Sequence, residues 1–186
     1  MSDQQEFDLK EIDKTNFICL KFPDSSLYYG EMAYFTADNE IISEEKMNEE
    51  IRKQDEKDED GNPKVEDKPF FKRKRHGPGA QVFYRPDKTV MCKYEGYWFR
   101  DEKHGFGRTF FPDGSKYEGN LDMGVKDGFG KFEWPNGESY DGRWRIGKMD
   151  GAGVFKKADG QRFAGTFKNN HFHKGGNVYI NPFDSR

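Results

Sequence analysis

The side chains best suited to chemistry in this sequence are four histidines and two cysteines. His171 and His173 form a His-x-His pair, which could hold a metal ion together with a third ligand. No cysteine or cluster of carboxylates near this pair completes such a site, so we expect no metal. Cys19 and Cys92 make no disulfide framework, and reduced thiols in a reducing compartment fit them better.

The other two histidines, His76 and His104, precede a Gly-x-Gly at equivalent places, where later copies carry Asp127 and Asp150. A position that accepts either His or Asp favours a role in a turn over a role in proton transfer. The sequence contains no G-x-S-x-G, no Walker-type loop and no Cys/His pairing typical of nucleophilic catalysis. We therefore predict a protein without catalytic activity, metal or cofactor.

Composition argues against several other functions. Hydrophobic residues make up 33% of the 186 residues and charged residues 35%, so a thick two-layer core is not expected. The net charge of −3 argues against a general electrostatic grip on nucleic acid. No apolar run approaches the length of a membrane span, and the acidic N-terminus resembles neither a secretory signal nor a transit peptide. We expect a cytoplasmic or cytoskeletal protein.

An internal repeat of 23 residues dominates the chain and must position any functional side chain. One aromatic column contains Tyr94, Tyr117, Tyr140 and Phe163, and a second column contains Trp98, Leu121, Trp144 and Phe167. Glycines form four further columns at the same spacing: Gly96, Gly119 and Gly142; Gly105, Gly128 and Gly151; Gly107, Gly130 and Gly153; Gly114, Gly137 and Gly160. Columns in register indicate stacked copies of one structural unit.

Each copy has the pattern of a β-hairpin. Dipeptides such as Asp113-Gly114 join the copies, and they favour tight turns because glycine tolerates positive φ. We assign the second turn of each copy to the Gly-x-Gly segment, as in residues 104–107. Two strands of about five or six residues with two turns account for the period. The prediction is an all-β fold: a single-layer, elongated, curved antiparallel sheet of stacked hairpins that advances about 10 Å per repeat.

The pattern YxGxW…GxGxF…DGxxY over residues 94–173 resembles the MORN-repeat family. The last copy keeps only its first half, because Lys174 and Phe183 stand where glycines are expected, so residues 174–186 are predicted to form a degenerate C-terminal cap. The resemblance implies a non-catalytic interaction module. Small proteins made only of these repeats are, in that family, often components of ciliary or flagellar axonemes, including radial spokes, or of other cytoskeletal scaffolds.

A damaged copy precedes the clear ones. Residues 23–30 (PDSSLYYG) match residues 112–119 (PDGSKYEG) position by position. This match places an N-terminal half repeat and the start of the first repeat at residues 16–36, after a tail at residues 1–15. Gly96 and His104 are 8 residues apart, whereas Gly30 and His76 are 46 apart. A charged insertion is therefore predicted at residues 37–75, and the first repeat ends over residues 76–93.

The insertion is acidic over residues 38–67 and ends in the basic run Lys72, Arg73, Lys74 and Arg75. Residues 41–53 could form a short amphipathic helix, with Ser43 and the following glutamates suited to its N-terminus. Two interpretations stay open. The insertion is either a solvated, flexible loop or a docking arm that orders on a partner. The basic run could meet an anionic partner, phospholipid included.

A single-layer sheet leaves a large surface for partners. Much of the aromatic ladder is expected to be structural, but part of it should line a groove that binds other proteins. The partner-binding candidates are Tyr94, Trp98, Tyr117, Tyr140, Trp144, Phe163 and Phe167. The end strands suit self-association. We therefore predict a scaffold subunit of a large assembly, such as the axoneme, with a phospholipid-binding module or an accessory subunit of an organellar (for example mitochondrial) complex as alternatives.

Overall fold

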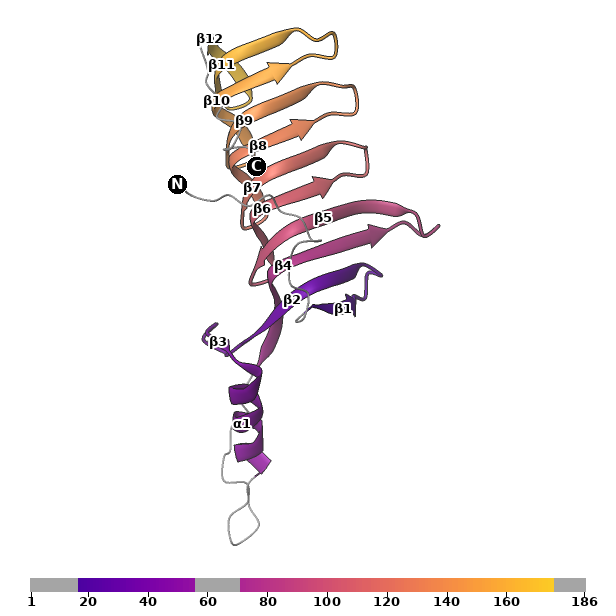
Figure 1. Cartoon of the computed structure of the whole chain (residues 1–186), viewed down its shortest axis with the longest axis vertical. Helices are drawn as coiled ribbons and strands as arrows, with labels where there is room; N and C mark the ends of the chain where they lie inside the picture. Colours follow the sequence, from indigo (N-terminus) through magenta and orange to yellow (C-terminus); the bar gives the residue numbers. More distant parts are fainter. Residues whose placement is uncertain (1–16, 56–70, 176–186) are drawn as a thin grey trace.

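The protein is a ladder of antiparallel strands, as a computed structural model shows for residues 17–55 and 71–175 (Figure 1). The predicted tail at residues 1–15, the middle of the insertion and residues 176–186 lie outside the described residues. One 12-stranded sheet runs in the order β1-β2-β4-β5-β6-β7-β8-β9-β10-β11-β12, and β3 pairs with β2. The strands are β1 (Ile18–Lys21), β2 (Leu27–Phe35), β3 (Ile41–Ile42), β4 (Lys72–Tyr84), β5 (Val90–Phe99), β6 (Glu102–Phe110), β7 (Lys116–Asp122), β8 (Val125–Glu133), β9 (Ser139–Arg145), β10 (Lys148–Lys156), β11 (Arg162–Lys168) and β12 (His171–Gly175). The predicted all-β sheet of stacked hairpins is confirmed.

Two kinds of turn alternate along the ladder, and both require positive φ. The longer turns resemble residues 111–115, where the Phe111 N–H donates to the Ser115 carbonyl at 2.9 Å and Asp113 Oδ1 accepts the Ser115 N–H at 2.9 Å. Their fourth residue has positive φ: Ser25 66°, Lys88 66°, Gly114 91°, Gly137 87° and Gly160 88°. The opposite side carries two-residue turns with both residues at positive φ, which is the type I′ pattern of tight hairpins: Arg100-Asp101, Met123-Gly124, Ile146-Gly147 and Asn169-Asn170.

The prediction that the Gly-x-Gly segments are turns is wrong. Gly105 and Gly107 lie inside β6, and the turn precedes that strand at Arg100-Asp101. Gly105 has a φ of 65° where the β5–β6 register shifts between Gly96 and Trp98, so it supports a bulge. Gly107 pairs with Gly96 on one side and Gly119 on the other. Glycine is required at position 107 because a neighbouring aromatic ring occupies the space that a side chain would need.

A tyrosine ring lies against four pairs of facing glycines: Gly30 and Gly79, Gly96 and Gly107, Gly119 and Gly130, Gly142 and Gly153. A Cβ added at Gly107 would lie 2.7 Å from Cε2 of Tyr94, so only glycine leaves room for the ring. The Tyr94 hydroxyl then donates to the Tyr97 carbonyl at 2.8 Å. The same hydrogen bond recurs from Tyr28 to the Glu31 carbonyl at 2.7 Å, from Tyr117 to that of Asn120 at 2.7 Å, and from Tyr140 to that of Arg143 at 3.0 Å. The Y-x-G signature is therefore one packing unit that is built once per repeat.

The core lies on one face of the sheet, which we name the aromatic face. Alternation along β5 buries Tyr94, Gly96 and Trp98 on this face and leaves Glu95 and Tyr97 on the other. The core cluster is Tyr28, Tyr94, Trp98, Tyr117, Leu121, Tyr140, Trp144, Met149 and Phe167. The opposite face, which we name the charged face, carries an alternating row across adjacent strands: Glu95, Arg108, Glu118, Lys131 and Asp141. One layer thus suffices, because polar side chains cover its second side.

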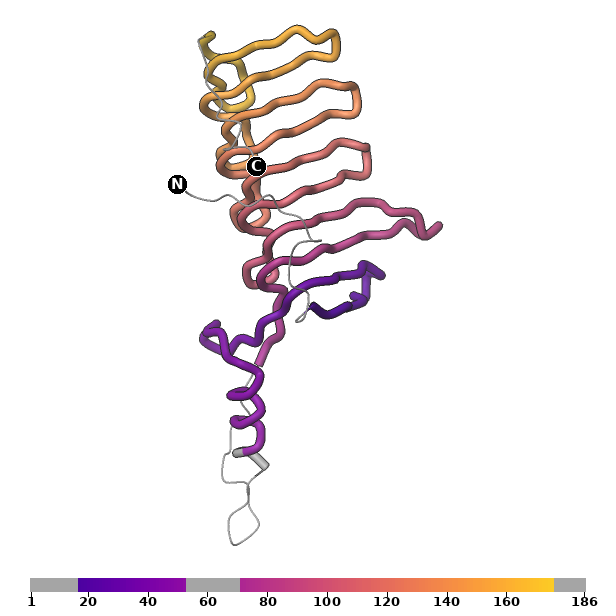
Figure 2. The backbone as a smooth tube through the Cα atoms, viewed as in Figure 1, coloured from indigo at the N-terminus to yellow at the C-terminus, as the bar shows by residue number. Residues whose placement is uncertain are grey.

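The insertion continues the first hairpin beyond the ladder. β2 and β4 stay paired as far as Phe35 and Lys72, so β4 begins inside the range predicted as insertion. The helix α1 (Glu44–Asp55) follows β3 and projects beyond the N-terminal end of the sheet (Figures 1 and 2). Ser43 caps it, since Ser43 Oγ accepts the Lys46 N–H at 3.2 Å and acidic residues occupy the first turn. The predicted short helix is confirmed.

Candidate interaction surface

The aromatic residues predicted to bind a partner are mostly buried. Six of the seven are at most 4% exposed: Tyr94, Trp98, Tyr117, Tyr140, Trp144 and Phe167; only Phe163 is partly exposed. Their rings pack edge to face along the ladder, for example Tyr94 with Trp98 at 5.0 Å and Tyr140 with Trp144 at 5.3 Å. These six rings are therefore part of the core, and their role in partner binding stays a prediction. Adjacent repeats shield one another's rings, which period alone did not show.

A different set of rings stays partly exposed on the same face. Phe111, Phe132, Trp134 and Phe155, which we name the aromatic strip, pack against the edge of the core. Consecutive ring centroids are 5.7, 4.7 and 5.6 Å apart, so the strip is continuous across β6 to β10. The sequence pattern did not indicate this strip. The rings of the strip belong to two repeat positions that are not aromatic in every repeat. Earlier repeats have Gln81 and Thr109 at the position of Phe132, and Arg85 at the position of Phe111.

A column of cations borders the core on the side of the tight turns. Arg75, Lys103 and Lys126 occupy equivalent repeat positions, and Met149 takes the fourth. Lys126 Nζ lies 4.1 Å from the centroid of Trp144 and 4.3 Å from that of Phe132, which belongs to the strip. Burial lowers the pKa of Lys126 to about 8 and lowers the pKa of Lys103. The strip is therefore flanked by an incompletely solvated positive charge.

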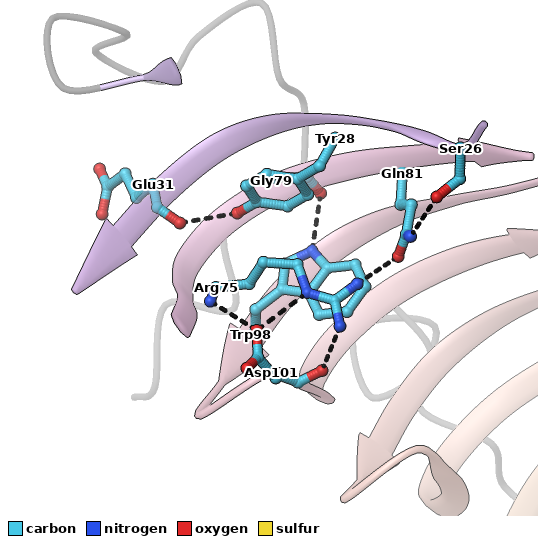
Figure 3. A network of polar contacts seen from close by, with 8 residues as sticks. All are labelled: Ser26, Tyr28, Glu31, Arg75, Gly79, Gln81, Trp98 and Asp101. Atoms are coloured by element: carbon cyan, nitrogen blue, oxygen red, sulfur yellow. Dashed lines mark hydrogen bonds and ion pairs between the residues drawn. The ribbon is translucent and has the colours of Figure 1, made fainter. Parts of the chain in front are cut away.

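Arg75 anchors the first repeat through a hydrogen-bonded network (Figure 3). Its guanidinium lies 4.1 Å from the Trp98 ring and donates to Asp101 Oδ1 at 3.1 Å and to the Asp101 carbonyl at 3.0 Å. It also donates to Gln81, whose amide donates to Ser26 Oγ at 3.0 Å. The network joins β4 to the β1–β2 turn and to the β5–β6 turn. Arg75 is thus a structural residue.

Comparison with known protein families identifies the repeat. The family model of the MORN repeat matches residues 94–116, 117–139 and 140–162. The protein is a MORN-repeat protein. MORN repeats are, in general, non-catalytic modules that bind proteins or membranes. No curated protein matches the chain.

The basic run that was predicted as an anionic-partner patch is split by the geometry of β4. Lys72 and Arg73 are exposed. Lys74 lies 5.1 Å from the Phe35 ring and donates to Asn39 Oδ1 at 2.7 Å, while Arg75 is held in the network above. Successive strand residues alternate between faces, so the four charges do not form one surface.

The His/Asp column of the MORN array contacts the next tight turn. Asp127 Oδ2 accepts the Ile146 N–H at 3.0 Å, and Asp150 Oδ2 accepts the Asn169 N–H at 3.4 Å. His104 Nδ1 lies 3.3 Å from Asp122 Oδ1. The His76 ring lies between those of Phe35 and Phe99, at centroid distances of 5.7 and 5.4 Å, and burial together with Arg100 lowers its pKa. These positions join repeats through their turns.

Other features that could carry chemistry are sparse in the part of the chain that the structure describes. No group of three or more His, Cys, Asp and Glu side chains there could hold a metal ion. Cys19 and Cys92 are both free thiols, and burial raises the pKa of Cys92. No helix among residues 17–55 and 71–175 is long and apolar enough to cross a bilayer.

Proposed function

We propose that this MORN-repeat protein is a non-catalytic scaffold subunit that binds a protein partner through the aromatic strip. The observation that carries the proposal is the continuous row of partly exposed rings at Phe111, Phe132, Trp134 and Phe155. A row of aromatic residues rimmed by charge has the composition of a binding hot spot, since aromatic side chains supply most of the energy in such interfaces. The buried columns beneath hold the strip in place.

The setting we propose is the axoneme of a cilium or flagellum, in a radial-spoke-like position, or another cytoskeletal assembly. The support is the resemblance to small proteins made mainly of MORN repeats. An accessory role in an organellar complex, such as a mitochondrial one, would use the same surface. Phospholipid binding finds less support, because only Lys72 and Arg73 of the basic run are exposed. Self-association through the end strands β1 and β12 stays a further proposal, and all five residues of β12 are exposed.

The test is an affinity capture of tagged protein from its native cells, washed at high salt without detergent. Three proteins are compared: the unaltered chain, the double variant Phe111→Ala/Trp134→Ala, and Tyr97→Ala as a control. Tyr97 is 41% exposed and lies on the charged face. We expect the double variant to lose the partner and the Tyr97 variant to keep it, with thermal unfolding as the check that both remain folded.

Two results would contradict the proposal. The first is full retention of the partner by the folded double variant, which would exclude the strip. The second is release of every partner by high salt, which would indicate a charged contact such as an anionic membrane. Recovery of tubulin-associated or spoke-like proteins supports the axonemal setting, whereas subunits of an organellar membrane complex would replace it.

A further inference from the structure

A cleft lies between the first two longer turns, β1–β2 and β4–β5. Its volume is about 580 Å³. Lys21, Ser25 and Leu27 line one wall, and Tyr84, Arg85 and Lys88 line the other. This volume lies in the range of sites for small molecules, about 300–1,000 Å³.

The cleft exists because one hairpin is longer than the rest. In the β4–β5 hairpin the facing glycines, Gly79 and Gly96, are 17 residues apart. In the β6–β7, β8–β9 and β10–β11 hairpins the facing glycines are 12 residues apart, and the facing pair Ile18 and Gly30 of β1–β2 has the same spacing. The tip of the long hairpin therefore extends past its neighbour, as Figure 1 shows for β4 and β5. The extended tip of the β4–β5 hairpin forms one wall of the cleft.

Two residues of the cleft hold a backbone conformation that L-residues disfavour. Ser25 and Lys88 both have a φ of 66°, at the turn position that is Gly114, Gly137 and Gly160 elsewhere. At those glycines an added Cβ would meet nothing within 4 Å, so glycine there serves the backbone alone. Among the turns that join the hairpins of the ladder, the two that line the cleft carry side chains at this position, as does Asn39, with a φ of 63°, in the turn between β2 and β3.

The charge of the cleft is strongly positive. Lys21, Arg85 and Lys88 bring three cations, and Asp24 is the one carboxylate among the lining residues. That carboxylate already accepts the Ser26 N–H at 2.9 Å, and the hydrogen bonds from Ser26 lower its pKa. Arg85 donates to the Val90 carbonyl at 3.0 Å and to the Pro112 carbonyl at 3.4 Å, which holds its guanidinium toward the β6–β7 turn and leaves Lys21 and Lys88 as the flexible cations of the cleft. Phosphate is the anion that such a set of donors recognises best.

We propose that this cleft binds a small organic phosphate, with its phosphate groups against Lys21 and Lys88 and a planar ring against Tyr84 and Leu27. The site is independent of the aromatic strip, which lies on other strands. A nucleoside diphosphate has this chemistry, and so does a phosphorylated lipid headgroup. The two sources differ in whether the ligand is free or held in a bilayer.

The experiment is calorimetric titration of the full chain at low salt with ADP and with inorganic pyrophosphate, beside sedimentation with vesicles of phosphatidylcholine and phosphatidylinositol phosphate. The decisive variant is Lys88→Gly, which restores the residue of the other turns. We expect the unaltered chain to show one saturable site. Lys88→Gly should bind about tenfold more weakly or worse, and its melting temperature should be higher. The control Lys148→Ala removes an exposed lysine of β10 and should bind unchanged. Tyr84→Ala should weaken ADP but not pyrophosphate.

The proposal is overturned if no probe binds, if Lys88→Gly binds as tightly as the unaltered chain, or if Lys148→Ala loses as much affinity. Binding of the vesicles alone, with the same dependence on Lys88, supports the phosphate site and assigns it to a lipid headgroup. Binding of ADP alone supports it and assigns the ligand to a soluble phosphate.

Discussion

The pairing of a tyrosine ring with facing glycines makes a sharp prediction at Gly130. In the structure Gly130 faces Gly119, and an alanine Cβ at Gly130 would lie 2.7 Å from Cε2 of Tyr117. Gly130 has no positive φ, so alanine causes no backbone strain there and the whole effect must come from the ring. We predict that Gly130→Ala strongly destabilises the array.

The magnitude follows from what Tyr117 would lose. Overpacking costs about 1–3 kcal/mol. A displaced ring also gives up its 2.7 Å hydrogen bond to the Asn120 carbonyl, about 1 kcal/mol, and its edge-to-face contact with Trp144 at 5.7 Å, about 0.5–1.5 kcal/mol. The sum is about 2.5–5.5 kcal/mol of unfolding free energy. Gly114→Ala is the matched control, since its φ is 91° with open space around it, and it should cost only about 1 kcal/mol.

The assay is urea unfolding followed by circular dichroism, in a double-mutant cycle with Tyr117→Ala. Once the ring is gone, the three atoms nearest to an alanine Cβ at position 130 are removed, and alanine also removes the entropy cost of a strand glycine, about 0.5–1 kcal/mol. Gly130→Ala should then be neutral or stabilising. An equal loss of stability in both backgrounds would refute the account of the Y-x-G signature.

Three further changes have expected outcomes. Ser25→Gly should raise stability by about 1 kcal/mol, read from the melting temperature, because the residue sits at a φ of 66°; a lower value would contradict the strain. Trp98→Ala with Trp144→Ala should cost several kcal/mol in chemical denaturation, because both are 4% exposed; an unchanged unfolding curve would contradict their role in the core. Lys126→Met copies the residue at Met149 and should stabilise by about 1 kcal/mol at pH 7. Since the pKa of Lys126 is lowered to about 8, the unfolded chain binds more protons between pH 8 and 10.5, and the advantage of methionine should shrink as pH rises through that window.

The architecture was predictable because each repeat contains several signals of the same hairpin structure. Period, Asp-Gly turns and the Y-x-G column predict stacked hairpins, and the match of residues 23–30 to 112–119 found the first turn even though Ser25 replaces glycine. Placement of the second turn failed at Gly105 and Gly107. A glycine that admits a neighbouring ring looks in sequence like a glycine that allows a turn, and only the register of β5 and β6 separates the two.

The candidate site was harder to predict for a different physical reason. In a single-layer sheet, contacts between adjacent repeats decide which side chains are buried. These contacts cover Trp98 and Trp144 but leave Trp134 partly exposed. Regular columns therefore indicate the core, and the surface that distinguishes this protein lies where columns change residue. Two such places are the position where Thr109 is followed by Phe132 in the next repeat, and the turn position where Lys88 stands in place of glycine.

The most direct test of the scaffold proposal is oxidative footprinting of the protein alone and in complex with its captured partner, with modified side chains quantified by mass spectrometry. The proposal predicts that Phe111, Trp134 and Phe155 become protected in the complex, whereas Tyr97 on the charged face keeps its reactivity. Protection of Tyr97 with no change along the aromatic strip would contradict it.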